Sequence, residues 1–477
     1  MVVLGRRIAR GGRERGAKPS PPATSGRSRS RSGTPERWPV PLALTKPALA
    51  GVGALRGVPA RMGRARRRLD RGERHFPVVT DGIVLSVGGT TLTEDGIQRI
   101  MKSLVYLDYN ATTPVLPEVR EAMWPYLNDA WGNPSSAYRF GAQAKGAIDR
   151  ARQQVAALVG AQSEEITFTS GATEANNTAI HSALSAGADK RHIITAEIEH
   201  SSVLHHCETL ARRGYPVTFL RVNRDGLIDL ADLEAAIRPD TAIVSLMWAN
   251  NETGVISPVQ AIGELCRKRG VCYHCDAVQA VGKVPLDFAS LPIDFLTLSG
   301  HKLGAPKGIG ALVVRQGVRF EPLIVGGKQE GGRRGGTESV PLIVALGVAC
   351  EQACRRSADA SKKVEAMRDE LEQILLSSIP GAYRNGGFPR LPNTFNFGIP
   401  GLDSSALVAF LDAQGVCVSS GSACMESAQA PSHVILAMTR NHRQATESVR
   451  ISLDHESRLD EVRTAAAIVI NAAKTLR

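Results

Sequence analysis

Short apolar runs alternate with longer amphipathic segments from about residue 140 onward. The apolar runs predict seven strands, at residues 166–169, 192–195, 217–222, 242–248, 271–275, 295–298 and 311–314. The segments between them predict helices, at 142–159, after Ser170-Gly171 through 179, and at 259–269. Strands separated by helices are joined by right-handed crossovers, which give a mainly parallel sheet with helices on both faces. The pattern therefore predicts an α/β fold.

The pattern changes toward the end of the chain. A long helical segment at 361–376 is followed by a smaller mixture of helices and strands that runs to residue 477. We therefore expect a large domain over 115–360 and a smaller α+β domain formed by 104–114 together with 361–477. No apolar run reaches the roughly 20 residues that a membrane-spanning helix needs, so we expect no membrane association.

The first 100 residues are expected to form a basic extension without regular structure. The 477-residue chain has a net charge of +12, but residues 1–75 alone carry a net +15 and the remainder is close to neutral. Three interpretations remain open: an organelle-targeting peptide, a nucleic-acid-binding tail, or a start codon assigned too early, with a natural start at Met101. We expect a cytoplasmic protein, or a mitochondrial one if the extension is a targeting peptide, and no nucleic-acid partner for the body.

Polar side chains follow five of the predicted strands, at the points where the strands end. They include hydroxyl, imidazole, amide, carboxylate and ammonium groups, within the segments 170–177, 197–202, 250–254, 276–279 and 299–302. Each segment alone is more often a helix cap or a turn. In an open α/β sheet, however, ligands bind outside the carboxyl ends of the strands. The five segments together therefore predict a binding site at one edge of the sheet.

Pyridoxal 5′-phosphate (PLP) is the ligand that needs this set of groups. Lys302 at a strand end could form a Schiff base with its aldehyde. Asp276 could keep the pyridine nitrogen protonated, so that the ring withdraws electrons. Ala172 and Thr173, at the start of a helix after Gly171, offer free N–H groups to its phosphate.

Three motifs carry a resemblance to a known family. They are 106–114 (Tyr-Leu-Asp-Tyr-Asn-Ala-Thr-Thr-Pro), 132–136 (Gly-Asn-Pro-Ser-Ser) and 299–302 (Ser-Gly-His-Lys). With the strand-end residues they resemble the fold type I PLP enzymes of class V, and specifically the cysteine desulfurases of the NifS/IscS type, over about residues 104–455. The resemblance implies conversion of L-cysteine to L-alanine, with Lys302 as the Schiff-base lysine and proton shuttle.

The resemblance also implies roles for the other residues. His200 would stack on the pyridine ring and take part in catalysis, Gln279 would bond the ring oxygen, and Asn251 would contact both cofactor and substrate. Arg450 would bind the substrate carboxylate, a task that suits a planar guanidinium. The phosphate would be held by Ala172, Thr173, Ser299 and His301, and by Thr337 of a partner subunit. A homodimer with shared active sites is therefore expected.

Cys424 follows the small residues Ser419-Ser420-Gly421-Ser422-Ala423. By resemblance it is the nucleophile that takes the sulfur as a persulfide and passes it on to an iron–sulfur scaffold or a tRNA-thiolation protein. The short loop resembles the group I enzymes, and Cys424 could also bind a transferred iron–sulfur cluster. A buried structural cysteine is the simpler alternative, but small polar neighbours disfavour burial.

Two other functions stay open at this point. A selenocysteine lyase or a class V transaminase needs no loop nucleophile, so Cys424 argues against both. An inactive sulfur-carrying or binding homologue is disfavoured by the intact set of polar residues. No resident metal is expected: Cys272 and Cys275 have a metal-like spacing but should point to opposite faces of a strand, and the remaining cysteines are expected to be structural. The chain departs from the family pattern at Tyr138, Lys328, Gly331, Gly335 and Asp454-His455.

Overall fold

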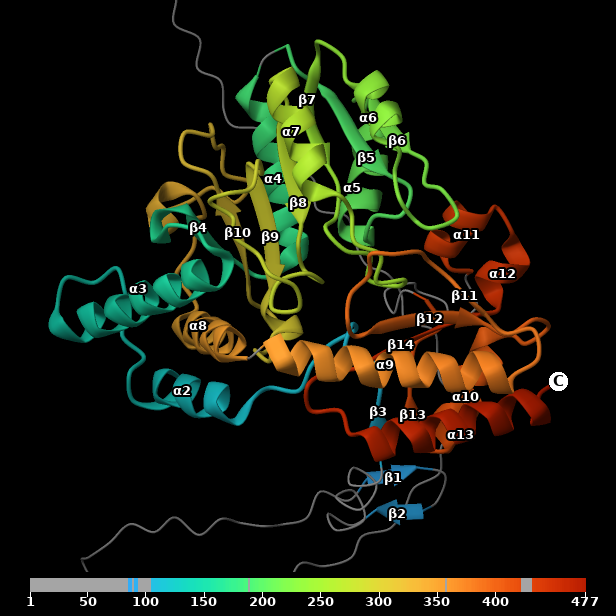
Figure 1. Cartoon of the computed structure of the whole chain (residues 1–477). Helices are drawn as coiled ribbons and strands as arrows, with labels where there is room; N and C mark the ends of the chain where they lie inside the picture. Colours follow the sequence, from blue (N-terminus) through green and yellow to red (C-terminus); the bar gives the residue numbers. More distant parts are fainter. Residues whose placement is uncertain (1–84, 88–89, 93–103, 188, 357, 422–430) are drawn as a thin grey trace, which may run out of the picture. The chain divides into compact units, whose positions relative to one another are not determined.

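A computed structural model describes residues 85–87, 90–92, 104–187, 189–356, 358–421 and 431–477, all within the compact unit formed by residues 80–477. Its centre is a seven-stranded sheet with the order β4-β10-β9-β8-β7-β5-β6 (Figure 1). The strands are β4 (Ile166–Thr169), β5 (His192–Ala196), β6 (Val217–Leu220), β7 (Thr241–Ser245), β8 (Cys272–Asp276), β9 (Phe295–Ser299) and β10 (Gly310–Val314). β10 runs in the direction opposite to the other six strands, which all share one direction. The expected mainly parallel α/β sheet is therefore confirmed.

Helices cover both faces of this sheet, as predicted. Successive strand residues point to opposite faces: Ile193 packs with α4 (Ala172–Ala186) and α5 (Ser201–Arg212), whereas Ile194 packs in the cluster on the other face. That second cluster contains residues of α3 (Arg139–Val159), α7 (Val259–Arg269) and α8 (Val340–Arg355). Two further helices, α2 (Pro117–Asn128) and α6 (Leu230–Ala236), contact α8 and α7 respectively. The sheet core is therefore closed on both sides, and its strand ends remain as the place for a site.

A second, smaller core lies in the C-terminal part of the chain. An antiparallel sheet of β11 (Tyr383–Arg384), β12 (Thr394–Gly398) and β14 (Ser448–Ser452) packs with α9 (Ala358–Ser378), α10 (Ser404–Ala413) and α13 (Leu459–Thr475) (Figure 1). The early strand β3 (Val105–Tyr106) pairs in parallel with β13 (Val416–Cys417). Residues 105–106 thus pair with a strand of the C-terminal part of the chain.

The short helices α11 (His433–Thr439) and α12 (His442–Thr446) pack differently. Their buried residues, including Val434 and Ile435, belong to the core of the seven-stranded sheet, although their sequence range was expected to form the smaller domain. The exact domain limits therefore stay a prediction. Within the expected N-terminal extension, β1 (Leu85–Val87) and β2 (Thr90–Leu92) pair as antiparallel strands, and the rest of residues 1–100 lies outside the described residues. No helix in the described part of the chain is long and apolar enough to cross a membrane.

Candidate active site

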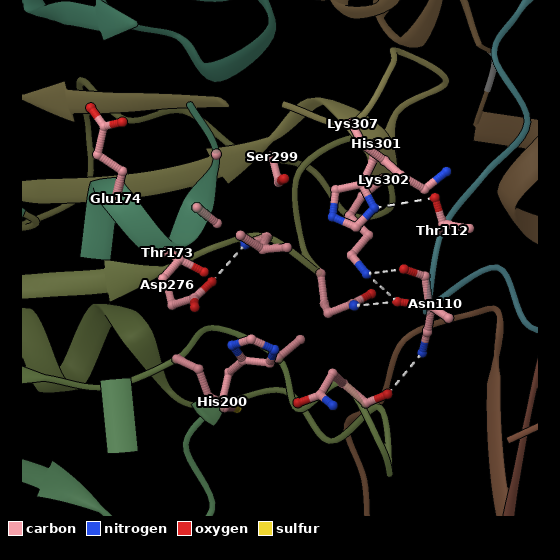
Figure 2. Close-up of a pocket in the computed structure, with 18 of the residues that line it drawn as sticks. Asn110, Thr112, Thr173, Glu174, His200, Asp276, Ser299, His301, Lys302 and Lys307 are labelled. Carbon is pink, nitrogen blue, oxygen red and sulfur yellow. Dashed lines mark hydrogen bonds between the residues drawn. The ribbon is translucent and has the colours of Figure 1, made fainter. Parts of the chain in front are cut away.

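A cavity of about 470 Å³ lies at the carboxyl ends of the sheet strands. This volume is in the range of small-molecule sites. The side chains that line it come from five strand ends, from the loop after β3 and from β14 (Figure 2). The predicted site residues that it brings together are Ala172, Thr173, His200, Asn251, Asp276, Gln279, Ser299, His301, Lys302 and Arg450.

Two predicted residues are not among them. Thr337 is exposed and does not line the cavity, so its assignment to a partner's phosphate stays a prediction. Cys424 lies outside the described residues, between Gly421 and Pro431. Among the other cysteines, Cys207, Cys266, Cys275 and Cys350 are buried, Cys272 and Cys417 are half-buried, and Cys354 is exposed. In the described residues, no three His, Cys, Asp or Glu side chains gather as they would around a metal ion.

The glycine turn at the start of α4 could hold a phosphate. Helix α4 begins at Ala172, directly after Gly171, whose φ of 152° and ψ of 176° suit only glycine. No atom lies within 4 Å of the point where a Cβ of Gly171 would be, so the turn borders open space. Burial, followed by the positive charges of Lys302 and Lys307, lowers the pKa of the His301 imidazole to about 4. His301 is therefore neutral, and Lys307, which also lines the cavity, adds a positive charge.

Asp276 ends β8 and lines the same cavity. Its Oδ2 accepts a hydrogen bond of 2.7 Å from Asn176 Nδ2, and its Oδ1 accepts one of 3.0 Å from the backbone N–H of Val278. Asp276 is only 6% exposed. Both hydrogen bonds come from neutral amides, and a nearly buried carboxylate is most stable beside a positive charge. The position thus favours a protonated ring nitrogen in the cavity.

His200 is held by a chain of hydrogen bonds that starts at Asp276. Asn176 Nδ2 also donates to Ser202 Oγ at 2.8 Å, and Ser202 Oγ lies 2.8 Å from His200 Nδ1. The backbone N–H of Ser202 donates to the same Nδ1 at 3.2 Å. Nδ1 is therefore an acceptor, and the proton of the neutral imidazole sits on Nε2. Burial lowers the pKa of His200, more than the charge of Asp276 raises it.

Lys302 follows β9 in the short 3₁₀ turn η2 (Gly300–Lys302). Its Nζ donates to two backbone carbonyls of the loop after β3, to Asn110 O at 2.5 Å and to Ala111 O at 2.6 Å (Figure 2). Gln279 Nε2 donates to the same carbonyl of Asn110 at 3.0 Å. The loop after β3 thus holds the amine at the centre of the cavity wall.

Arg450 enters the cavity from β14 and is 2% exposed. Its Nη2 donates to Asp108 Oδ1 at 2.6 Å and its Nη1 to Asn251 O at 2.9 Å. Two buried polar atoms here, Arg450 Nε and Asn251 Oδ1, have no hydrogen-bond partner within the described part of the chain. Unsatisfied buried donors and acceptors are rare in folded proteins. These two atoms therefore point to a polar ligand with both an acceptor and a donor.

The residues present fit PLP. A helix N-terminus with a glycine turn, a nearly buried carboxylate and a lysine line one cavity, and each matches a different part of that molecule: phosphate, ring nitrogen and aldehyde. The two unpartnered atoms near Arg450 match the carboxylate and amino group of an amino acid. Two observations on this structure support the fit: the buried polar atoms without a hydrogen-bond partner, and the open space beside Gly171.

The residues of the site that were not assigned from sequence include Asp108, Asn110, Asn176, Ser202 and Lys307. Asp108 and Asn110 stand within the motif 106–114, and Asn176 within the segment after β4. The side chains of the first four make hydrogen bonds to other residues in and around the site, and Asn110 and Lys307 line the cavity. The sequence motifs indicated which segments form the site. Only the structure shows which side chains these residues hydrogen-bond.

The mainly parallel sheet, Lys302 in the turn after β9 and the Asp276 carboxylate at the end of β8 are features of the fold type I class of PLP enzymes. Residues 105–464 match the family model "Aminotransferase class-V". A cysteine desulfurase of Trichormus azollae is 51% identical over 364 residues, 76% of this chain and 91% of the relative. A solved "NIFS-LIKE PROTEIN" is 36% identical with a TM-score of 0.73, covering 78% of this chain and all of that one. Another structure, "SspA in complex with cysteine", is 39% identical with a TM-score of 0.66, over 73% and 98% of the two chains.

The chain therefore belongs to the class V aminotransferase family and, within it, to the cysteine desulfurases of the NifS/IscS type.

Proposed function

We propose that the protein is a PLP-dependent cysteine desulfurase that converts L-cysteine to L-alanine and moves the sulfur to an enzyme cysteine. The observation that carries the proposal is the convergence of Lys302, Asp276 and Arg450 on one cavity, in a chain 51% identical to a cysteine desulfurase. When bound, PLP supplies an aldehyde that condenses with amines and a protonated ring that withdraws electrons from the substrate's α-carbon.

Arg450 would bind the carboxylate of L-cysteine. Its guanidinium is nearly buried, it is fixed on two sides by Asp108 and Asn251, and its Nε has no hydrogen-bond partner among the described residues. A buried guanidinium binds a carboxylate through charge-assisted hydrogen bonds, which are about twice as strong as neutral ones. Asn251 Oδ1 would accept a hydrogen bond from the substrate's amino group. Together they fix the substrate with its α-carbon toward Lys302.

Lys302 would then hold and move the proton of the substrate's α-carbon. Its amine is attached to a short turn, and the carbonyls of Asn110 and Ala111 restrict its position. His200, neutral and protonated on Nε2, offers a donor to the same region without adding charge. A general base works best when it is placed within hydrogen-bond reach of the proton that it takes.

Cys424 would supply the nucleophile. Its thiolate forms a bond to the substrate's sulfur, the carbon–sulfur bond breaks, and its electron pair stays on the carbon, which takes a proton and becomes the methyl group of alanine. L-cysteine and an enzyme thiol thus become L-alanine and an enzyme persulfide, with no external oxidant. The persulfide sulfur would pass to an iron–sulfur scaffold or a tRNA-thiolation protein.

We also propose that the protein acts as a cytoplasmic homodimer. Large apolar side chains are exposed on α2 and on two loops of the large domain: Trp124, Leu127, Trp131, Tyr138, Leu323, Ile324 and Val325. Contiguous exposed apolar surface is typical of protein–protein interfaces. Thr337 is exposed close in sequence to one of these loops, which agrees with a role in the partner's phosphate site.

Purification in the presence of PLP tests the proposed function. The protein should carry the visible absorption band of lysine-bound pyridoxal, and L-cysteine should change that band and yield alanine. A protein that takes up no PLP, or that takes it up and leaves L-cysteine unchanged, contradicts the proposal.

A further inference from the structure

A second lysine, Lys283, lies beside Lys302 and has no role in the proposed function. Lys283 Nζ donates to Gln279 Oε1 at 2.7 Å and to Asn110 Oδ1 at 2.8 Å. Both acceptors belong to residues that line the active-site cavity. Lys283 itself lines a second cavity of about 530 Å³, which Lys302 also lines. Both amines therefore donate to Asn110, and both residues line the second cavity.

The hydrogen bonds of Lys283 fix the orientation of the Gln279 amide. An ammonium group has only donors, so it must face the carbonyl oxygen of the amide and not its NH₂ group. The NH₂ group of Gln279 then points the other way, where Nε2 donates to Asn110 O at 3.0 Å. The carbonyl of Asn110 can only accept, so it requires the same orientation, and Lys283 adds a second contact that holds the amide in place. Lys283 thus reinforces the orientation in which Gln279 Nε2 is a donor.

Asn110 connects Lys283 with Lys302 directly. Its side-chain oxygen accepts from Lys283 and from Asn393 Nδ2, and its backbone oxygen accepts from Lys302. Asn110 is 1% exposed, and its Nδ2 donates to Thr394 Oγ1 at 2.9 Å. A residue fixed at so many points transmits a change at one contact to the others. Loss of Lys283 should therefore alter the carbonyl that positions Lys302.

More positive than negative groups act on the charge of Lys283. Lys302 and Arg450 face it as positive groups and Asp454 as a negative one, and Arg356, His455 and Cys354 line the same second cavity. Burial first, and then the charge of Lys302, lower the pKa of Lys283 to about 7. The repulsion is mutual, because each ammonium group disfavours the charge of the other. Removal of Lys283 therefore removes one of the positive charges that face Lys302.

We propose that Lys283 is a positioning residue of the active site, which fixes Gln279 as a donor and keeps the Lys302 amine in the form that reacts with an aldehyde. The inference rests on the proposed function, because it assigns to Lys302 the reaction with PLP. Lys283 need not touch the cofactor or the substrate. It acts through Gln279, Asn110 and its own charge.

The test compares three variants of the full-length chain with the wild type. Lys283→Met removes the charge and all donors at similar volume, and Lys283→Arg keeps the charge. Lys268→Met, at an exposed position on α7, is the matched control. Pulses of acetic anhydride at a series of pH values, followed by mass spectrometry, give the titration midpoint of Lys302 before PLP is added. The pH dependence of the visible band and the values of kcat and KM for L-cysteine follow after PLP is added.

In Lys283→Met the midpoint of Lys302 should rise by roughly one pH unit, as expected for the loss of one nearby charge. The visible band should shift its pH dependence in the same direction. kcat should fall about tenfold while KM changes little, because Arg450 is untouched. Lys283→Arg should keep a midpoint close to that of the wild type, as should Lys268→Met.

An unchanged midpoint and an unchanged band in Lys283→Met would overturn the inference. Should that variant fail to fold, Lys283→Gln provides the same comparison, because it is also uncharged. The midpoint is measured without PLP and without turnover. A wild type that binds no PLP would therefore count against the proposed function, whereas an unchanged midpoint counts against the role of Lys283 alone.

Discussion

Arg450 on β14 donates from Nη2 to Oδ1 of Asp108, in the loop after β3, at 2.6 Å. Two segments 342 residues apart thus hold the group that we propose to bind the substrate carboxylate. A buried positive charge requires a negative partner in the absence of substrate. Asp108 satisfies this need through Nη2, and Nε has no hydrogen-bond partner among the described residues.

Arg450→Lys should therefore weaken substrate binding although it keeps the charge. A lysine cannot reach Asp108, Asn251 and a carboxylate at once, because it lacks the planar fork of donors. We expect kcat/KM for L-cysteine to fall by roughly 10²-fold, about 2.7 kcal/mol, mostly through KM. Steady-state alanine formation measures it, with the exposed Arg463→Lys as the control. An unchanged KM in Arg450→Lys would show that another residue binds the carboxylate.

Lys302→Ala should abolish the visible band and alanine formation while the fold remains intact. The other groups around the cavity, including Asp276 and the glycine turn at Gly171, are unaffected, so PLP should still bind without a covalent link. Borohydride reduction followed by mass spectrometry tests this, because the wild type should become labelled at Lys302 and the variant should not. Turnover of L-cysteine by the variant, or a reducible link at another lysine, would refute the assigned role.

Gly310→Ala should damage both stability and cofactor binding. A Cβ at Gly310 would lie 2.7 Å from Leu298 O and 2.9 Å from the backbone of Gly171, which forms the proposed phosphate turn. Since all these atoms are backbone, the ends of β9 and β4 must move. We expect a loss of roughly 1–3 kcal/mol in the free energy of unfolding and a higher dissociation constant for PLP.

Gly146→Ala in α3 is the control for that experiment. A Cβ at Gly146 meets only the end of the Arg150 side chain, at 3.7 Å. Alanine is the better helix former, so this variant should be neutral or up to about 1 kcal/mol more stable. Urea unfolding and PLP titration of both variants measure the effects. Equal behaviour of the two would contradict the close packing of Gly310 against the turn.

His274 should make the fold sensitive to mild acid. It is completely buried, Nδ1 contacts Ser245 Oγ and Nε2 contacts Thr297 Oγ1, and burial lowers its pKa to about 4. Between pH 6.5 and 4 the unfolded chain binds a proton at this residue and the folded chain does not, so stability falls as the pH falls through this window. From pH 7 to 5 the loss from His274 should be about 2 kcal/mol.

The comparison with His274→Gln isolates this effect, because glutamine does not titrate. Glu199 acts in the opposite sense, since burial raises the pKa of its carboxyl, but it is present in both chains. Urea unfolding at pH 7 and at pH 5 should show a larger loss for the wild type than for the variant. Parallel losses would mean that His274 is not buried in its neutral form.

Strand positions could be predicted because buried parallel strands are short apolar runs. The residue at which each strand leaves the hydrogen-bonded ladder could not be predicted. The run at 242–248 continues through Leu246 and Trp248, but β7 ends at Ser245. Both residues remain buried, and their backbone N–H groups donate to β8 carbonyls outside the regular ladder. Hydrophobicity reports burial and not strand pairing. For the same reason the antiparallel direction of β10 could not be predicted.

The ligand-contacting part of the site was predictable because strand ends of a parallel sheet meet at one edge. His200, Asp276 and Lys302 follow from this rule and line one cavity. Asn176 could not be predicted, because its role is to link Asp276 with Ser202, and hydrogen bonds between distant segments leave no periodic pattern. Arg450 came only from the resemblance to a family, since it lies far along the chain on a different sheet.

The central claim is sulfur transfer from L-cysteine through Cys424, and one assay tests it most directly. Purified protein with PLP, L-cysteine and a thiol reductant should release sulfide and alanine in equal amounts. Cys424→Ser should keep the PLP band and its response to L-cysteine, because Lys302, Asp276 and Arg450 are unchanged. A serine hydroxyl attacks sulfur poorly, whereas a few per cent of a thiol is thiolate near neutral pH. The variant should therefore lose several powers of ten in sulfide release and carry no persulfide. If it keeps more than about a tenth of the wild-type rate, a difference under 1.4 kcal/mol, Cys424 is not the nucleophile and the account is wrong.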